Sequence, residues 1–293
     1  MKTYLDCIPC FFRQALESAR RSGASKKTQK KILDALAKAI PGISLKSSPP
    51  EMARVIHKQI RKIIKKKDPY RKIKQHSNKV ALSIYDKLKK KVNHSHDKLL
   101  TAVELAIAGN IIDYGAKNSV NVDEELKKIL NQEDKAIQKE AKAIFDYSKF
   151  KQSLRKARNI LYLADNAGET VFDRVLIEEI RRIDNSKEIT YAVKESPAIN
   201  DALMEDAVIC GIDKIAKVIS SGSDAPGTVL SLCSKSFLKI YRKAGMVISK
   251  GQGNFEALSG VRRPIFFMFM AKCPVIACEV NCKIGDVILC YKG

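Results

Sequence analysis

Hydrophobic residues recur every three to four positions through most of residues 1–157. The segments FFRQALESAR and TQKKILDALAKAI show this spacing, and SSPP at 47–50 interrupts it. Such spacing is typical of amphipathic helices. The segment KLLTAVELAIAGNIIDYG is apolar around most of its circumference, so we expect a central helix that ends near Gly115. No segment of this half has a convincing strand pattern.

After Asn159 short apolar runs alternate with segments of helical spacing. The runs NILYLA, EITYAV, KIAKVIS, GMVIS, PIFFMFM and DVILC predict strands. Strands that alternate with helices favour a mostly parallel sheet covered on both faces. The pattern therefore predicts an α/β fold with two parts, an all-helical domain at 1–157 and an α/β domain at 158–293.

Composition fits a globular protein that works away from membranes. The chain has 293 residues, of which 45% are hydrophobic, so it can bury a sizeable core. No apolar run approaches the 18 or more residues that span a bilayer. The first residues, MKTYLDCIPC, lack the clean apolar stretch of a signal peptide, so we expect a cytoplasmic location. In that setting the eight cysteines are expected to be reduced thiols.

Positive charge is concentrated in the first third of the chain. Residues 1–100 contain 26 lysines and arginines against 7 acids, which accounts for +19 of the total charge of +22. This asymmetry raises nucleic-acid binding as an alternative function. A solvated lysine surface also promotes solubility and attracts anionic substrates, so the nucleic-acid alternative is the less favoured one.

Polar residues and glycines follow four consecutive predicted strands. The strand ends carry DNAGE at 165–169, KESPAIND at 194–201, SSGSDAPGT at 220–228 and SKGQGNFE at 249–256. Ligands of parallel sheets bind beyond the carboxyl ends of the strands. Glycines there let backbone N–H groups approach a ligand, and each following helix directs its N-terminus to the same region. This composition predicts a site for an oxyanion or phosphate together with a hard metal ion.

The candidate metal ligands are Asp165, Asn166 and Asp201. They offer only oxygen atoms, which favours magnesium or manganese. Gly168 allows the departure from strand geometry that would let two adjacent side chains serve one ion. Each residue has a simpler alternative, because Asp and Asn are also common helix caps. Asp165 or Asn166 could cap the next helix, and Asp201 could cap ALMEDAVICG.

The candidate phosphate ligands are Lys250 and the backbone around Gly251 and Gly253. A lysine directly after a strand can place its ammonium on a phosphate, while the glycine turn offers N–H donors. The alternative for Lys250 is a solvated surface lysine, since the chain has many lysines. Lys194 is a weaker candidate of the same kind, with a structural role or a place at the edge of the substrate site as the favoured interpretations. Glu169 could orient or deprotonate a water molecule, or it could simply be a favourable acid in the first turn of a helix.

Two polar residues interrupt the central apolar helix of the first half. Asn110 and Asp113 need partners, which could lie in the interior or in the crevice at the strand ends. Gly109 beside Asn110 favours the crevice slightly. The four histidines accompany no nucleophile motif, and we expect them at the surface.

Cys7 and Cys10 form a C-x-x-C motif, and Cys278 and Cys282 lie near the other end of the chain. A structural zinc site would require the two pairs to meet in space. The alternative is that both N-terminal cysteines face the core from one helix, which we favour. A redox dithiol is less favoured still, because no strand precedes the motif.

Six motifs together resemble the damage-control phosphatase family, in its prokaryotic branch with an N-terminal C-x-x-C. They are CIPCFFRQAL, AGNIIDYG, DNAGETVFD, KESPAINDAL, SGSDAPGT and SKGQGNFEAL, and they extend in order over nearly the whole chain. The resemblance implies helices packed on a Rossmann-like three-layer α/β/α domain. It also implies metal-dependent hydrolysis of small phosphorylated metabolites, such as sugar phosphates or damaged cofactor intermediates.

The resemblance also assigns roles to four positions. The metal-binding acid–amide pair falls on Asp165 and Asn166, the second metal-binding acid on Asp201, and the phosphate-binding lysine on Lys250. Magnesium or manganese is the expected metal, with nickel and cobalt as further candidates. The lysine-rich segment at 61–75 is not part of the shared pattern.

The resulting hypothesis is phosphomonoester hydrolysis with one divalent cation. A methyltransferase that uses S-adenosylmethionine is the main alternative, because its fold is similar and this activity has been proposed within the family. Such enzymes usually have several glycines after the first strand, whereas DNAGET has one. The sequence indicates neither the physiological substrate nor the oligomeric state.

Overall fold

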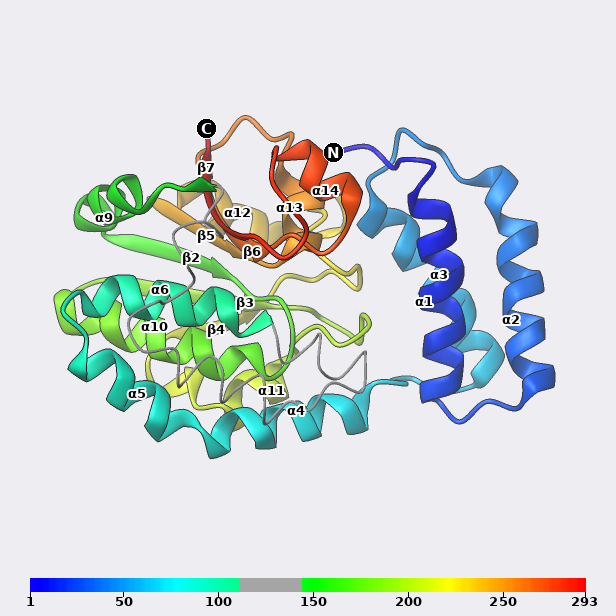
Figure 1. Ribbon diagram of the computed structural model, residues 1–293, viewed down its shortest axis with the longest axis horizontal. Helices are drawn as coiled ribbons and strands as arrows, with labels where there is room; N and C mark the ends of the chain where they lie inside the picture. Colours follow the sequence, from blue (N-terminus) through cyan, green and yellow to red (C-terminus); the bar gives the residue numbers. More distant parts are fainter. Residues whose placement is uncertain (111–143) are drawn as a thin grey trace.

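The computed structural model describes residues 1–110 and 144–293. An N-terminal group of three helices lies beside a larger α/β body, and both chain ends lie near the top of Figure 1. The α-helices are α1 (Cys7–Arg21), α2 (Lys26–Ala39), α3 (Pro49–Ile64), α4 (Arg71–Ser83), α5 (Tyr85–His94), α6 (Lys98–Ala108), α9 (Tyr147–Lys156), α10 (Glu169–Ile183), α11 (Met204–Ile209), α12 (Lys235–Lys243), α13 (Gln252–Leu258) and α14 (Pro274–Glu279). The strands are β1 (Ile144–Phe145), β2 (Asn159–Leu163), β3 (Glu188–Val193), β4 (Lys217–Ser220), β5 (Met246–Lys250), β6 (Ile265–Met270) and β7 (Val287–Lys292).

The seven strands form one mostly parallel sheet, which confirms the predicted fold class. Their order is β1-β7-β6-β5-β2-β3-β4, and β2 through β6 run in one direction. Strand β7 is antiparallel to β6, and β1 pairs parallel with β7. The strand order reverses beside β2, whose two neighbours are β5 and β3. Ligand sites of open α/β sheets lie at such a reversal.

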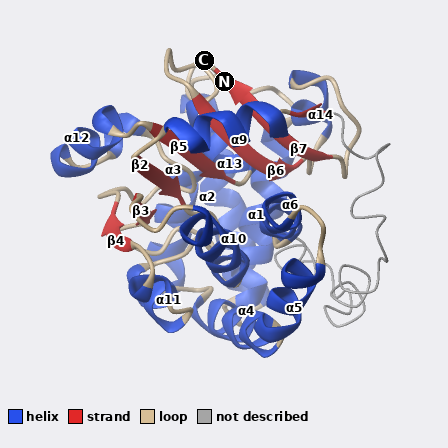
Figure 2. Cartoon of the chain, turned by 90° about the vertical axis from the view of Figure 1, so that its left-hand side faces the viewer, coloured by secondary structure: helices blue, strands red, loops and turns tan. Residues whose placement is uncertain are grey.

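Helices cover both faces of the sheet, so the body has three layers (Figure 2). Alternate residues of β2 show the division. Ile160 and Tyr162 join a core with α5, α6, α9 and α10, whereas Leu161 and Leu163 join a core with α12, α13 and α14. Successive side chains of a strand point to opposite faces, and both faces here are apolar, which is why the strand sequences read as continuous apolar runs.

Helices α1, α2 and α3 have a separate hydrophobic core, formed by residues such as Phe11, Ile32, Ile56 and Ile60. Helices α4, α5 and α6 instead contribute to the core beneath the sheet. The hydrophobic cores therefore divide between α3 and α4, whereas the sequence places a boundary at residue 157. The division into domains at 157 stays a prediction.

Two expectations about the first 157 residues are wrong. The two-residue strand β1 extends the sheet beside β7, although two residues are too few to give a sequence pattern. His57 is buried on α3, not exposed, and its Nε2 has no hydrogen-bond partner in the described part of the chain. Burial and the nearby Arg61 lower the pKa of His57 to about 4, so the imidazole is neutral at pH 7.

The carboxyl ends of the parallel strands point toward the α1–α3 unit (Figure 1). Helix α3 bridges the two parts, because Arg54 and Arg61 pair with Asp224 in the loop after β4. The four polar strand ends of the sequence analysis therefore lie where the two cores meet. Within the described residues no helix is both long and apolar enough to cross a bilayer.

Candidate active site

Asp165 and Asn166 follow β2 after one intervening residue, Ala164, and are almost completely buried. The helix cap alternative is wrong for both, because Gly168 is the N-cap of α10 and no side chain caps it. Gly168 has a φ of +84°, and its N–H donates to Asn78 Oδ1 over 2.7 Å. A positive φ is readily available to glycine, so this residue lets the chain turn away from the strand direction as the sequence analysis expects.

Asp201 lies beside this pair, although it is 35 or 36 positions away in the sequence. Asn166 and Asp201 form an isolated antiparallel β-bridge, and Ala202 N donates to Asp165 O over 2.8 Å. The cap alternative for Asp201 is also wrong, because α11 begins at Met204 with Leu203 as its N-cap. The structure therefore brings Asp165, Asn166 and Asp201 together at the edge of the sheet.

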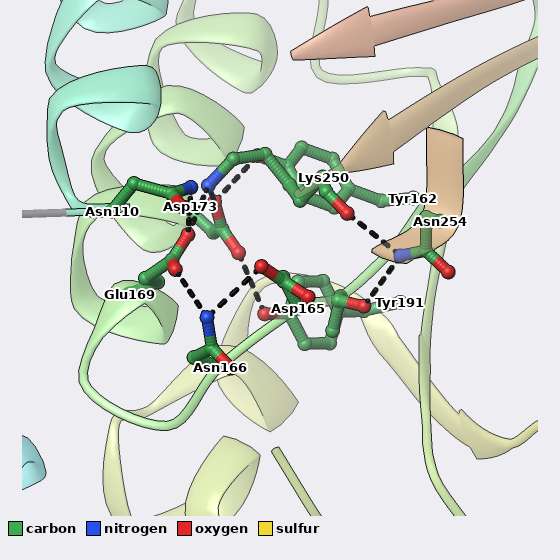
Figure 3. A network of polar contacts seen from close by, with 10 residues as sticks. Asn110, Tyr162, Asp165, Asn166, Glu169, Asp173, Tyr191, Lys250 and Asn254 are labelled. Atoms are coloured by element: carbon green, nitrogen blue, oxygen red, sulfur yellow. Dashed lines mark hydrogen bonds and ion pairs between the residues drawn. The ribbon is translucent and has the colours of Figure 1, made fainter. Parts of the chain in front are cut away.

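A buried cluster of charged side chains adjoins these residues (Figure 3). Lys250 lies at the end of β5, and its Nζ is 3.2 Å from Glu169 Oε2 and 2.7 Å from Asp173 Oδ1. Glu169 and Asp173 are four residues apart, so they share one face of α10. Asn166 joins the cluster, because its Nδ2 donates to Asp165 Oδ2 over 2.9 Å and to Glu169 Oε1 over 2.8 Å.

Burial and charge act on the pKa values of this cluster in opposite ways. Burial raises the pKa of Glu169, and the Lys250 charge opposes that rise. Burial alone would lower the pKa of Lys250, but the carboxylates of Asp173 and Glu169 outweigh it, so the pKa of Lys250 is raised. Lys250 is therefore protonated at neutral pH and places a positive charge beside both acids.

Asn110 lies at the site, not in a separate part of the interior. Its Nδ2 donates to Glu169 Oε2 over 2.9 Å, and the side chain is completely buried. Of the two places that the sequence left open for Asn110, the structure therefore favours the crevice at the strand ends over a separate part of the interior. Asp113 and the helix end expected near Gly115 lie outside the described residues.

Lys250 is more enclosed than the sequence suggests. The side chain is fully buried, so it is not a solvated surface lysine, and its Nζ donates to the carboxylates of Glu169 and Asp173. Lys194 is buried as well, and its Nζ lies 3.4 Å from Asp201 Oδ2. The expected phosphate contact of Lys250 and the substrate contact of Lys194 stay predictions, and in this arrangement each lysine pairs with site carboxylates.

The two glycines after β5 allow close approach of backbone segments. Gly251 has a φ of +82°, and a Cβ placed on it would lie 1.9 Å from Asp165 Oδ2. A side chain at this position would therefore displace the Asp165 carboxylate. Gly253 adjoins the loop after β4, where a Cβ on Gly227 would come within 2.5 Å of Gly253 O.

The sequence analysis did not select four residues that hold the site together. Tyr162 OH and Tyr191 OH donate to the two oxygens of Asp173, over 2.7 and 2.8 Å. Asn254 Nδ2 donates to Ala164 O and Lys250 O, and its Oδ1 accepts from Thr228. Asp173 could have been found, because α10 is buried around most of its circumference and an acid in such a helix needs partners. The roles of the tyrosines depend on strand neighbours that the sequence does not show.

The cysteines do not form a recognisable metal centre. Across residues 1–110 and 144–293, no three His, Cys, Asp or Glu side chains are grouped so as to hold a metal ion. All eight cysteines are free thiols. The zinc alternative for Cys7, Cys10, Cys278 and Cys282 therefore has no support, and burial raises the pKa of Cys7.

Fold and site together define a class of protein. The sheet is mostly parallel and has helices on both faces. Acidic, amide and lysine side chains at its strand ends lie close together at the point where the strand order reverses. This arrangement is typical of α/β enzymes that bind small polar substrates at the carboxyl ends of the strands.

Comparisons with known proteins narrow this class to one family. Residues 3–288 match the damage-control phosphatase ARMT1-like domain, and the chain belongs to that family. It is 34% identical to a damage-control phosphatase of Pyrococcus horikoshii, over 98% of this chain and 97% of that protein. A crystal structure of that DUF89 family protein covers 100% of both chains with a TM-score of 0.87 and 32% identity.

Two further relatives agree with this assignment. A damage-control phosphatase of Archaeoglobus fulgidus is 33% identical over 81% of this chain and 80% of its own length. A 4'-phosphopantetheine phosphatase of mouse is 27% identical over 57% of this chain but only 23% of its own length. The phosphatase class expected from the sequence is confirmed, and it is favoured over the methyltransferase and nucleic-acid alternatives.

Proposed function

We propose that the protein is a divalent-metal-dependent phosphomonoester hydrolase, with its metal centre at Asp165, Asn166 and Asp201. The observation that carries the proposal is the convergence of three buried, oxygen-bearing side chains at the edge of the sheet. Asn166 forms a β-bridge with Asp201, and its Nδ2 donates to Asp165 Oδ2 over 2.9 Å, so residues from two separate strand ends meet at one place. A divalent cation would suit this place, because buried carboxylates favour a positive charge close by.

The donor set fits a hard metal ion. Two carboxylates and an amide supply oxygen ligands only, and ions such as Mg²⁺ and Mn²⁺ retain waters at their other positions. The close approach of Asp165 to Gly251 leaves this carboxylate fixed against backbone. Metal binding by Asn166 requires its Oδ1, whereas its Nδ2 now faces Asp165 and Glu169. A half-turn of the amide exchanges the two atoms.

Different residues of the site would have different roles in the hydrolysis. When bound, the cation would supply Lewis-acid polarisation of a phosphoryl oxygen. Glu169 has a raised pKa and lies next to the metal ligands, which suits a group that orients a water molecule or accepts its proton. Lys250 would hold Glu169 in place and bring positive charge close to the phosphate. Gly251 N–H already donates to Met268 O over 2.9 Å, so among the expected backbone donors it is the N–H groups of Gln252 and Gly253 that would face the phosphate.

The proposed substrates are small phosphorylated metabolites. The mouse relative is named for 4'-phosphopantetheine, a phosphomonoester, and the archaeal relatives are named damage-control phosphatases. Sugar phosphates and damaged cofactor intermediates belong to the same chemical class. A cytoplasmic location would suit such substrates and stays a prediction.

A phosphatase screen tests the proposal. The purified protein is assayed with p-nitrophenyl phosphate and a panel of phosphorylated metabolites, with magnesium, manganese, cobalt and nickel in turn. We expect phosphate release that depends on the added metal and is abolished by chelation. The Asp165→Ala, Asn166→Ala double variant should be inactive, and activity equal to wild type in that variant would contradict the proposal.

A further inference from the structure

Asp201 lies in a loop, so its position depends on what that loop contacts. Strand β3 ends at Val193 and α11 begins at Met204, which leaves residues 194–203 without regular structure of their own. Ile199 in this loop has a φ of +52°. A β-branched residue with positive φ is strained, and such strain persists only where the surrounding structure enforces it. The question is which contacts enforce the conformation two residues before Asp201.

A second loop, at 221–229, lies against the first. Glu195 N donates to Ser223 O over 3.0 Å, and Ser221 N donates to Val193 O over 2.8 Å. Gly227 N also lies 3.4 Å from Asp201 Oδ2, so this loop contacts the carboxylate itself. The two loops therefore form one unit around Asp201.

Two arginines of α3 hold both loops. Arg61 Nη1 donates to Pro197 O over 2.8 Å, and its Nη2 lies 3.9 Å from Asp224 Oδ2. Arg54 Nε pairs with the other oxygen of Asp224. Each contact is made by a partly buried guanidinium, whose several donors lie in a fixed plane and thus restrain direction as well as distance.

Helix α3 is a firm support for these arginines, because it is anchored independently of the sheet. Its residues Ala53, Ile56 and Ile60 pack into the core shared with α1 and α2. Ser48 and Glu51 form a capping box at its N-terminus. Arg54 and Arg61 are seven residues apart, close to two helical turns, so they project from the same face toward the loops.

We propose that Arg54 and Arg61 are positioning residues that fix Asp201 beside Asp165, and thereby set the affinity of the centre for its divalent cation. This inference rests on the proposed function. Partners outside the ligand set orient ligands and typically contribute a factor of ten to a hundred in metal affinity. The α1–α3 unit thus contributes to the site without supplying a ligand.

Binding of Mn²⁺ to the metal-free protein, followed by the electron paramagnetic resonance signal of free Mn²⁺, tests the proposal without using activity. We expect the Arg54→Ala and Arg61→Ala variants to bind with a Kd at least about tenfold higher than wild type. Arg181→Ala is the matched control, because Arg181 also donates to backbone carbonyls, those of Ile215 and Asn185, but at the amino ends of β3 and β4. Its Kd should stay within about twofold of wild type.

Activity gives a second readout that distinguishes positioning from general stability. The Mn²⁺ concentration for half-maximal rate should rise in the α3 variants by the same factor as the Kd, while kcat at saturating Mn²⁺ is retained. A Kd equal to wild type, or a loss of kcat at saturating metal with unchanged Kd, would overturn the inference. If the Arg61→Ala variant does not fold, Arg61→Lys replaces it in the test, because lysine keeps the positive charge. The Kd of Arg61→Lys for Mn²⁺ should also exceed that of wild type.

Metal binding by the wild-type protein distinguishes a failure of this inference from a failure of the proposed function. Failure of wild type to bind Mn²⁺ or any of the other three metals would refute the metal centre itself, and the inference with it. Tight binding by wild type together with unchanged binding by both alanine variants would refute the positioning role alone.

Discussion

Lys250 and Asp173 form a completely buried ion pair, with 2.7 Å between Nζ and Oδ1. The two residues come from two different sequence motifs, Lys250 from the end of β5 and Asp173 from α10. The hydroxyls of Tyr162 and Tyr191 also donate hydrogen bonds to Asp173. The ion pair and these hydrogen bonds therefore link α10 to three strands of the sheet, and Lys250 places a positive charge in the site.

Removal of the Asp173 charge should destabilise the protein strongly. In Asp173→Asn the ammonium of Lys250 keeps Glu169 alone as its partner, and an amide group must face hydroxyl donors. Breaking a buried pair by loss of one partner costs about 3–5 kcal/mol, and we expect a loss of this size in urea denaturation. The control Asp213→Asn changes an exposed aspartate in the segment before β4 and should unfold like wild type. Equal stability of the Asp173 variant would show that the pair is not needed for folding.

A methyl group at Gly251 should disrupt the site directly. Gly251→Ala places a Cβ 1.9 Å from Asp165 Oδ2 and imposes a positive φ on alanine. Displacement of a reacting group by about 1 Å costs on the order of a hundredfold in rate, so we expect at least that loss in p-nitrophenyl phosphate hydrolysis. Gly260→Ala is the control, because a Cβ there meets no atom within 4 Å. Similar rates for the two variants would contradict the placement of Asp165 at the reacting centre.

Asn254 should matter for stability more than its position in a short helix suggests. Its amide joins the ends of β2 and β5 to the loop after β4 through Ala164 O, Lys250 O and Thr228. In Asn254→Ala these buried groups lose their partner, and each lost partner of this kind costs about 1–3 kcal/mol. The free energy of unfolding should therefore fall by several such increments. Asn185→Ala, on an exposed turn, is the comparison, and a fall no larger than in that variant would contradict the linking role.

His57 should make stability depend on pH below neutrality. Its pKa is about 4 in the folded protein, because of burial and Arg61, against 6.5 in the unfolded chain. The unfolded chain binds the proton more tightly, so the stabilisation present above pH 6.5 is lost as pH falls toward 4. The full loss corresponds to about 3 kcal/mol.

The test compares wild type with His57→Leu in urea denaturation from pH 7 to pH 4. Other groups titrate in this range, so the quantity of interest is the difference between the two proteins. We expect the variant to lose less stability than wild type on acidification, whereas His76→Leu, at an exposed histidine, should follow wild type. Parallel curves for wild type and His57→Leu would show that His57 does not titrate as proposed.

Much of the fold could be predicted because its strands are buried on both faces. The runs at 159–163, 188–193 and 265–270 are continuous apolar segments bounded by polar turns, and a parallel sheet leaves this pattern in the sequence. The grouping of Asp165, Asn166 and Asp201 was predictable for a related reason, since parallel strands bring their carboxyl ends to one edge. Direction was not predictable for β7, because an apolar run looks the same in either orientation.

The sequence could not show how the site residues pair. Lys250 looks like a phosphate ligand by its position after a strand, but its partners Glu169 and Asp173 depend on the rotation of α10 about its axis. His57 lies in the lysine-rich half of the chain, which suggests a surface position, but its side chain is buried on α3. Tertiary contacts between distant segments decided both outcomes.

The hold of α3 on the loops around Asp201 also has a consequence for biosynthesis. Arg54 is translated long before Asp224, and Asp165 is translated long before Gly251. The contacts of Arg54 and Asp165 therefore cannot form until these later residues have been synthesised. Contacts of such high sequence separation form late in folding. A nascent or truncated polypeptide thus carries the acidic residues without their final geometry, and hydrolytic competence arrives only after the segments with Asp224 and Gly251 have been translated.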